Sequence, residues 1–215
     1  MRILLIGPPG VGKGTQAELL GERFGIAHIA SGDIFRAELQ GNTTLGRIAK
    51  EYMERGELVP DQVTIDMMAK RILSPAARDN GFVLDGFPRT VAQAEALDLL
   101  LTSLDMALDR VVVLNVPDDV VHERLGGRLS CSRCGAAYHL KFNPPKREGE
   151  CDRCGGELAV RKDDEPETIR ERLRVYRAST APVVAHYERQ GKVVRLDGGL
   201  SREDVLNSIL DAIPK

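Results

Sequence analysis

A short apolar run followed by a glycine-rich segment with a single lysine most constrains what this chain can fold into. Residues 3–6 read Ile-Leu-Leu-Ile, and residues 7–15 read Gly-Pro-Pro-Gly-Val-Gly-Lys-Gly-Thr. The apolar run is typical of a buried strand, and residues 15–24 have the apolar spacing of a helix that Gly25 would end. A strand, a glycine-rich loop and a helix in this order predict a phosphate-binding loop.

The residue types of this loop suit an anion. Glycines let the backbone curl until its N–H groups point inward, the helix N-terminus adds positive potential, and Lys13 adds a full charge. The usual motif has Ser or Thr directly after the lysine, but here Gly14 follows it and Thr15 comes one residue later. The hydroxyl that normally binds Mg²⁺ is therefore displaced, and we expect the metal to be held mainly through water and phosphate.

Further apolar runs alternate with amphipathic segments of helical length. We expect strands at residues 26–30, 81–85, 110–116 and 192–196, and helices at residues 31–39, 45–55, 63–73, 90–104, 120–125 and 201–213. Ser31 and either Asp118 or Asp119 are candidate N-caps. Strands separated by helices predict an α/β fold, here a three-layer phosphate-loop fold with a parallel sheet flanked by helices.

The composition of the 215 residues favours one main domain with an insert and excludes several classes of protein. Lys and Arg number 30 and Asp and Glu 32, so the net charge of −2 argues against bulk binding to nucleic acid or membranes. Aromatic residues make up only 4% of the chain, too few for a stacking platform. No apolar run has the length of a transmembrane helix or a signal peptide, and we expect a cytoplasmic protein with reduced cysteines.

All four cysteines lie in one segment without helical pattern, residues 127–163, which we interpret as a small inserted domain. Cys131 and Cys134 form one pair, Cys151 and Cys154 a second pair, and sixteen residues separate the pairs. Each pair is followed by a glycine that permits a tight turn around the sulfur atoms. This spacing predicts a closed tetrahedral site for a structural metal, Zn²⁺ by preference, in a zinc-ribbon-like fold. The alternatives are unligated thiols or disulfides.

The chain returns to a helix directly after this insert. Asp164 and Glu167 have the spacing of a capping box, and Pro166 is tolerated in a first helical turn. We therefore expect the helix to begin at Asp164.

Several arginines have no obvious carboxylate partner in the sequence. Arg89 follows a strand that ends at Asp85, where open α/β sheets bind ligands. Arg124 and Arg128 are four residues apart and share a helix face if the helix reaches that far. Planar guanidinium groups suit a transition state whose charge spreads over phosphoryl oxygens, whereas a single arginine is often only a surface charge. The other members of the set are Arg36, Arg161 and Arg172.

Asp85 is an acidic group at the end of the apolar run Phe82-Val83-Leu84. A carboxylate in this position could orient water bound to Mg²⁺. The alternative is an ordinary turn acid at a strand end.

These motifs together resemble the adenylate kinase family, in the form with a long metal-binding lid, over essentially the whole chain. The order and spacing of the motifs carry the resemblance. They are residues 7–15, Ser31-Gly32-Asp33 with Arg36, Glu57-Leu58-Val59, Leu84 to Thr90, Gln93, Glu123-Arg124 with Arg128, the four cysteines, Lys141 to Pro145, and Arg161 to Asp164.

The resemblance implies reversible phosphoryl transfer from MgATP to AMP, which gives two ADP. It implies that ATP is held by Gly10, Val11, Gly12, Lys13, Gly14, Thr15, Arg128, the backbone of Ala137 and Tyr138, and Leu200. It implies that AMP or the moving phosphate contacts Ser31, Arg36, Glu57, Leu58, Val59, Gly86, Phe87, Pro88, Arg89, Gln93, Arg161 and Arg172. We expect catalysis to depend on Lys13, Asp85, Arg89, Arg124, Arg128, Arg161 and Arg172. Ser31 stands where the family often has threonine, and Leu200 replaces a residue that is often polar.

The chemistry of the candidate residues agrees with this reaction. A phosphate acceptor is already anionic and needs no strong base, so alignment and charge neutralisation must supply the catalysis. Water is a competing acceptor, and the site must be covered before transfer. We expect the insert, residues 127–163, to be the lid and residues 31–73 a second mobile flap over AMP. Residues 1–30, 74–126 and 164–215 would form the core.

Gln93 is the candidate that would select the acceptor base. It lies four residues after Arg89, and residues four apart share a helix face. An arginine on the phosphate and an amide on the adenine edge could then grip one nucleotide, because an amide offers both a donor and an acceptor. The alternative is a solvated helix residue.

Two other functions stay open on the sequence alone. One is a nucleoside monophosphate kinase whose acceptor is GMP, CMP or UMP. The other is a nucleotide-switched zinc-ribbon protein that binds nucleic acid, although the charge balance and the few aromatic residues weigh against it. We expect ATP, AMP and ADP as partners, no nucleic acid, no membrane, and a monomer.

Overall fold

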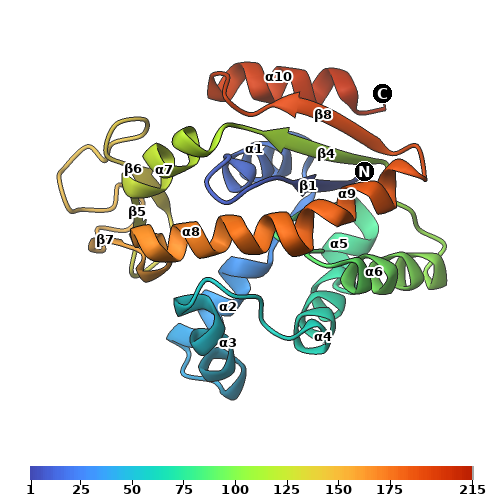
Figure 1. Ribbon diagram of the computed structural model, residues 1–215, viewed down its shortest axis with the longest axis horizontal. Coiled ribbons are helices and arrows are strands. Elements are labelled where there is room, and N and C mark those ends of the chain that lie inside the picture. The colour runs from blue at the N-terminus through green and yellow to red at the C-terminus, as the bar shows by residue number, and fades with distance from the viewer. Residues whose placement is uncertain (215) are drawn as a thin grey trace.

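The computed structural model describes residues 1–214 and has a five-stranded parallel sheet at its centre (Figure 1). In spatial order the strands are β2 (Ala27–Ala30), β3 (Phe82–Asp85), β1 (Arg2–Ile6), β4 (Arg110–Asn115) and β8 (Val193–Asp197). Every neighbouring pair in this sheet is parallel. The expected α/β fold with a parallel sheet flanked by helices is confirmed.

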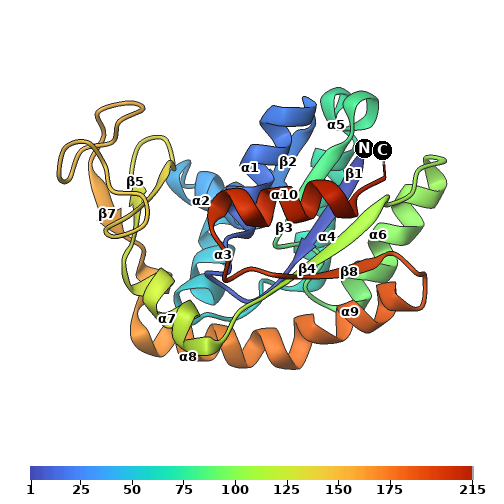
Figure 2. The same cartoon turned by 90° about the horizontal axis from the view of Figure 1, so that it is seen from above.

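The two faces of the sheet are covered by different sets of helices. Successive side chains of a strand point to opposite faces. Ile3 and Leu5 pack with the core that includes α1 (Lys13–Phe24) and α10 (Arg202–Ala212), whereas Leu4 and Ile6 pack with the core on the other face. Figure 2 shows α10 and the long helical segment of residues 166–188 on opposite sides of the sheet. Both faces are apolar, which is why the strands read as continuous hydrophobic runs.

The second face is covered by another set of helices, one of which belongs to the segment expected to form the flap. They are α4 (Asp61–Ile72), α5 (Pro75–Asn80), α6 (Val91–Ser103), the π-helix η2 (Tyr176–Thr180) and α9 (Ala181–Glu188). Helix α8 (Pro166–Val175) continues into η2 but buries its apolar residues in a separate cluster. The flap, residues 31–73, consists of α2 (Ser31–Gln40), α3 (Thr44–Glu54) and α4. It lies below the sheet in the view of Figure 1.

The insert forms its own small sheet to one side of the main sheet (Figure 1). Three antiparallel strands pair in the order β6 (Ala137–His139), β5 (Arg128–Cys131) and β7 (Leu158–Val160). At its base, α7 (Asp118–Gly126) packs on α8 through Val121, Leu125, Ile169 and Leu173. The chain leaves the insert through a short 3₁₀ helix, η1 (Lys162–Asp164).

Several helix ends differ from the sequence expectations. The expected C-cap at Gly25 is confirmed, since its φ is 63° and its N–H bonds the carbonyl of Gly21. The expected cap at Ser31 is wrong: Ala30 is the N-cap of α2, and the Ser31 hydroxyl donates elsewhere. The aspartates at the start of α7 are also not caps, because the helix begins at Asp118 after Pro117.

The expected capping box at Asp164 and Glu167 is wrong as well. Helix α8 begins at Pro166 with Glu165 as its N-cap, and no side chain caps it. The Asp164 carboxylate accepts hydrogen bonds from arginines instead. Among residues 1–214, no helix is long and apolar enough to cross a membrane.

Candidate active site and metal centre

The glycine-rich loop connects β1, near the middle of the sheet, to α1. Helix α1 begins at Lys13, two residues earlier than expected, so Lys13, Gly14 and Thr15 occupy its first turn. The N–H groups of a first turn lack helical partners and face an anion readily. Gly12 has a φ of 105°, which side-chain-bearing residues rarely adopt. Local sequence thus shapes the predicted phosphate loop.

Lys13 is held over the loop by main-chain carbonyls. Its Nζ donates to the carbonyls of Gly7 at 2.8 Å and Pro8 at 2.9 Å. Burial lowers the pKa of Lys13 to about 8, although the nearby charge of Asp85 opposes this shift. The ammonium group is therefore short of negative partners, and a phosphate would supply them.

The loop after β3 places Arg89 beside the same region. Arg89 Nε donates to the carbonyl of Gly86 at 2.7 Å, and Ser31 Oγ donates to that carbonyl at 2.6 Å. Gly86 has a φ of 73°, and a Cβ there would lie 2.8 Å from both the Arg89 guanidinium and the Ser31 hydroxyl. Only glycine fits this close approach. The hydroxyl of Thr180, in η2, also donates to the carbonyl of Arg89 at 3.0 Å.

The arginines of the site lie close enough together for their charges to repel one another. Burial lowers the pKa of Arg89, and the charges of Arg172 and Arg36 lower it further. Burial likewise lowers the pKa of Arg161, with Arg128 and Arg36 adding to the shift. Guanidinium groups stay charged in proteins, so these lowered pKa values indicate electrostatic repulsion between the arginines. A bound anion would reduce this repulsion.

Arg124 has a different position from the other candidates. Its Nη1 donates to the carbonyls of Val11 at 3.0 Å and Gly198 at 2.8 Å. The guanidinium thereby fastens the phosphate loop to the loop between β8 and α10, where Leu200 is exposed. The expected shared helix face with Arg128 is wrong, because α7 ends at Gly126 and Arg128 begins β5.

Two aspartates that the sequence analysis did not assign to the site hold its arginines. Asp164 accepts a bidentate pair from Arg128, at 2.7 and 2.6 Å, and a further bond from Arg172 at 2.9 Å. Asp163 lies 3.1 Å from Arg172. Burial raises the pKa of Asp163, but Arg172 and the neighbouring arginines together hold it below its usual value. The sequence feature that could have identified Asp163 and Asp164 is their position directly after Arg161-Lys162.

Gln93 is almost completely buried rather than solvated. Its Oε1 accepts from the backbone N–H of Arg89 at 2.8 Å, and its Nε2 donates to Asp61 at 2.7 Å. Helix α6 begins at Val91, after the N-cap Thr90, so Arg89 precedes the helix and does not share its face. The alternative of a solvated Gln93 is therefore wrong.

The other acceptor-site candidates divide into core and surface residues. Val59 and Phe87 belong to the main hydrophobic core, so only their backbone could meet a nucleotide. Arg36 pairs with Asp33 at 2.5 Å on the flap. Glu57 pairs with Arg55 at 2.9 Å and is exposed. Leu58 is half-buried and Pro88 is buried.

The four cysteines form one cluster in the insert. Their sulfur atoms all lie within 4.8 Å of one another, and the pairs Cys131–Cys154 and Cys134–Cys151 are 3.5 and 3.6 Å apart. A zinc ion with four Zn–S bonds of about 2.3 Å needs sulfur atoms about 3.8 Å apart, so the cluster fits this ion. All four are free cysteines without a disulfide.

Backbone turns and one tyrosine support the cluster. The N–H groups of Arg133 and Cys134 donate to the Cys131 sulfur at 3.4 and 3.5 Å. The Tyr138 hydroxyl lies 3.5 Å from the Cys151 sulfur and accepts from the N–H of Asp152 at 2.8 Å. The Tyr138 side chain thus belongs to the core of the insert, while the neighbouring Ala137 is exposed.

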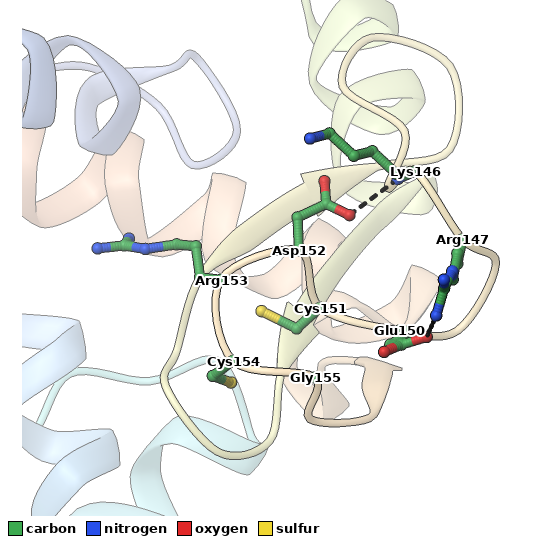
Figure 3. Close-up of a pocket in the computed structure, with 8 residues that line it drawn as sticks. All are labelled: Lys146, Arg147, Glu150, Cys151, Asp152, Arg153, Cys154 and Gly155. Atoms are coloured by element: carbon green, nitrogen blue, oxygen red, sulfur yellow. Dashed lines mark hydrogen bonds and ion pairs between the residues drawn. The ribbon is translucent and has the colours of Figure 1, made fainter.

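A surface pocket of about 310 Å³ lies beside the second cysteine pair (Figure 3). Two contacts join the ends of the loop that lines this pocket, residues 146–155. The Asp152 carboxylate accepts from the N–H of Lys146 at 3.0 Å, and Arg147 pairs with Glu150 at 3.4 Å. These contacts order the loop that carries Cys151 and Cys154.

Sequence comparisons agree with this geometry. The profile of the family described as Adenylate kinase matches residues 5–192. The chain belongs to the adenylate kinase family. A curated adenylate kinase of Carboxydothermus hydrogenoformans is 53% identical over 215 residues, all of both chains. One from Clostridium botulinum is 50% identical over 209 residues, 97% of this chain and 96% of the relative. One from Caldicellulosiruptor saccharolyticus is 47% identical over 213 residues, 99% of each.

Membership in this family establishes the class of reaction. Adenylate kinases are nucleoside monophosphate kinases that transfer a phosphoryl group between ATP and AMP, and they use Mg²⁺ with ATP. The resemblance deduced from the sequence motifs, and the enzyme class it implied, are confirmed.

Proposed function

We propose that the reaction takes place at the carboxyl ends of β1 and β3, where the phosphate loop, Lys13 and Arg89 meet. The observation that supports this most directly is that Arg128 and Arg172 converge on the Asp164 carboxylate, and the charges of both also act on Lys13. Asp85, Asp163 and Asp164 balance part of this positive charge, and an anionic ligand would balance the rest. Two nucleotide phosphate chains would supply that charge.

The donor nucleotide would occupy the phosphate loop. Backbone N–H groups from Gly10 to Thr15 would hold its phosphates, and Lys13 would follow the γ-phosphoryl group. Arg128 and the backbone of Ala137 and Tyr138 would contact the nucleotide from the insert. Leu200 would lie beside the adenine, in the loop that Arg124 fastens to the phosphate loop. In this proposal Arg124 acts by positioning the loop.

The acceptor AMP would occupy the space between the flap and the loop after β3. Arg36, Arg89, Arg161 and Arg172 would hold its phosphate, and Gln93 would meet the base. Ser31, residues 57–59 and residues 86–88 would line this subsite. Aligned phosphates and spread positive charge supply the rate enhancement, since the attacking oxygen needs no base.

Asp85 is the residue that fits the magnesium ion. A Cβ on Gly14 would lie 3.3 Å from Asp85 Oδ2, so this carboxylate borders the position where other phosphate loops carry a hydroxyl. We propose that Asp85 and Thr15 orient the water shell of Mg²⁺. When bound, the ion supplies neutralisation of the phosphate oxygens.

The insert would act as the lid and the flap as a second moving part. Contacts between them are exposed and few: Gln40 Nε2 donates to the Ser132 carbonyl at 3.1 Å, and Lys162 pairs with Glu54 at 3.3 Å. Exposed contacts of this kind are weak, which allows opening and closing. A four-cysteine Zn²⁺ site would replace the hydrophobic core that the insert is too small to form.

We also propose a monomer in a reducing cytoplasm. The cysteines are grouped for a metal rather than paired as disulfides, which suits a reducing compartment.

The test is coupled ADP formation from MgATP with AMP, GMP, CMP and UMP in turn, combined with Gln93→Leu. We expect AMP to be strongly preferred. In the variant, the KM for AMP should rise while the KM for ATP stays near its original value, because ATP occupies the other subsite. Equal use of GMP or UMP by the unmodified enzyme would overturn the assigned acceptor. An unchanged KM for AMP in Gln93→Leu would remove Gln93 from the subsite.

A further inference from the structure

The side-chain amide of Gln93 is held between a donor and an acceptor from different segments. Oε1 accepts from the N–H of Arg89 at 2.8 Å, and Nε2 donates to Asp61 Oδ1 at 2.7 Å. An amide turned by 180° keeps its shape but exchanges its oxygen and its nitrogen. Here the turn would set Nε2 against an N–H group and Oε1 against a carboxylate. The two neighbours therefore fix one orientation.

Asp61 is itself anchored at both oxygens. Its Oδ2 accepts from the hydroxyl of Thr90 at 3.1 Å, and the same hydroxyl accepts from the N–H of Gln93 at 3.1 Å. Asp61 is the first residue of α4 in the flap, whereas Thr90 is the N-cap of α6. Gln93 is only 1% exposed, so water does not compete for the amide. Each amide atom uses one of its two hydrogen-bonding positions here, so one donor and one acceptor remain for a base once the surrounding segments make room for it.

The orientation of this amide decides which purine it matches. Adenine presents an N–H₂ donor beside a ring-nitrogen acceptor, and the hypoxanthine of IMP presents a carbonyl acceptor beside a ring N–H donor. An amide pairs with the first edge in one orientation and with the second after a 180° turn. Discrimination between the two bases therefore depends on the free energy that the turn would cost.

We propose that Asp61 is a specificity-determining positioning residue that holds the Gln93 amide in the orientation that matches adenine. The inference rests on the proposed function, in which Gln93 meets the acceptor base. A carboxylate suits this task because it can only accept, whereas asparagine or glutamine could pair with either end of the amide.

Asp61→Asn is the direct test, because it keeps the shape but offers a donor as well as an acceptor. A hydrogen bond to a charged group is stronger than one to a neutral group, so we expect the ratio of kcat/KM for IMP to that for AMP to rise about ten-fold. The change should appear mainly in KM for the acceptor, with little change in KM for ATP. The matched control is Asp66→Asn in the same helix, where an exposed carboxylate accepts from Gln62 Nε2 at 2.8 Å. Its ratio should not change.

Two further variants separate selectivity from stability. Asp61→Ala removes the acceptor altogether and should raise the same ratio. Thr90→Val removes the cap and the contact to Asp61, and it should lower the melting temperature without raising the ratio. A ratio that is unchanged in both Asp61 variants, or raised equally by Thr90→Val, would overturn the proposal.

Gln93→Leu distinguishes a failure of this inference from a failure of the proposed function. If Gln93→Leu leaves KM for AMP unchanged, Gln93 does not meet the base and both statements fall. If Gln93→Leu raises KM for AMP while the Asp61 variants keep the original selectivity, only the role of Asp61 is wrong.

Discussion

Arg128, at the start of the insert, forms a bidentate ion pair with Asp164, at its end. The two bonds measure 2.7 and 2.6 Å, and the Asp164 side chain has no exposed surface. Arg172 of α8 donates to the same carboxylate at 2.9 Å. One buried carboxylate therefore joins both connections of the insert to the helix on which it rests, and it orients two arginines of the proposed site.

Asp164→Ala should lower the free energy of unfolding by about 3 kcal/mol, because it leaves two arginines without their buried partner. Urea unfolding of the metal-loaded protein measures the change. The control is Asp118→Ala, which removes an exposed pair with Arg177 and should cost less than about 1 kcal/mol. Equal losses in the two variants would show that the Asp164 network contributes no more than a surface pair.

The pKa of Lys13 predicts how nucleotide binding depends on pH. The folded-state pKa of about 8 lies below the ordinary value of 10.5, so near pH 8 about half of the lysines are neutral. A polyphosphate favours the charged form, so binding of a non-hydrolysable ATP analogue at pH 8 should take up roughly half a proton. Affinity should fall as the pH rises above 8. Calorimetry in buffers of different ionisation enthalpy measures this uptake.

The same lysine pKa has a consequence for the free protein. The unfolded chain binds more protons than the folded one between pH 8 and 10.5, so this group makes the protein more stable as the pH rises through that range. Lys13→Met should abolish both the proton uptake and this contribution. Lys50→Met, at an exposed position of α3, should retain both. Proton uptake that persists in Lys13→Met would assign it to another group.

Contiguous motifs were predictable from the sequence because their function resides in local backbone geometry. The phosphate loop needs a strand, glycines and a helix start, and the cysteine pairs need only their spacing and a following glycine. The turns at Gly135 and Gly155 have φ values of 74° and 68°, in the region that those glycines permit. These features depend little on the rest of the fold.

Partners that are distant in sequence were not predictable. Asp164 has the spacing of a capping residue, but its arginine partner lies 36 residues away, and the ion pair takes precedence over the cap. Asp61 and Gln93 are 32 residues apart, and no local pattern connects them. Helix α5 has only six residues, too few to show a helical apolar period, although Ser74, Pro75 and Gly81 mark its ends. Helix α8 continues through a π-helical turn into α9, so no cap residue separates them.

Arg89→Lys should lower kcat/KM about 100-fold, the loss typical of removing one preorganised donor from a transition state. A lysine carries the charge but cannot provide a planar fork, and it would also lose the bond from Nε to the Gly86 carbonyl. Steady-state kinetics with AMP and ATP measure the effect. Arg195→Lys, which alters an exposed pair with Glu188, is the control and should be nearly neutral. Near-normal activity of Arg89→Lys would contradict the role of Arg89.

Elemental analysis should find about one equivalent of metal per chain, and Cys131→Ser should lose it. The melting temperature should then fall, because metal binding energy in a closed thiolate site is folding energy. Activity should fall indirectly, through a disordered insert. Ser132→Ala, in the same turn, removes only a 3.2 Å bond to the Glu157 carbonyl and should keep the metal. Metal-free wild-type protein with full activity would contradict a structural metal.

Two helical glycines give a matched pair of alanine substitutions that tests the packing of the flap. Gly46 of α3 faces the backbone of α2, and a Cβ there would overlap the carbonyl of Glu38. Gly126, the last residue of α7, has open space around its Cβ position. Gly126→Ala should therefore stabilise the protein by about 0.5–1 kcal/mol, since alanine loses less backbone entropy on folding.

Gly46→Ala should instead destabilise by roughly 1–3 kcal/mol, because α2 and α3 must move apart. Since Arg36 is carried by α2, we also expect KM for AMP to rise while KM for ATP stays constant. Thermal unfolding together with acceptor and donor kinetics measures both effects. If Gly46→Ala proved as stable as Gly126→Ala, the close contact between α2 and α3 would be wrong.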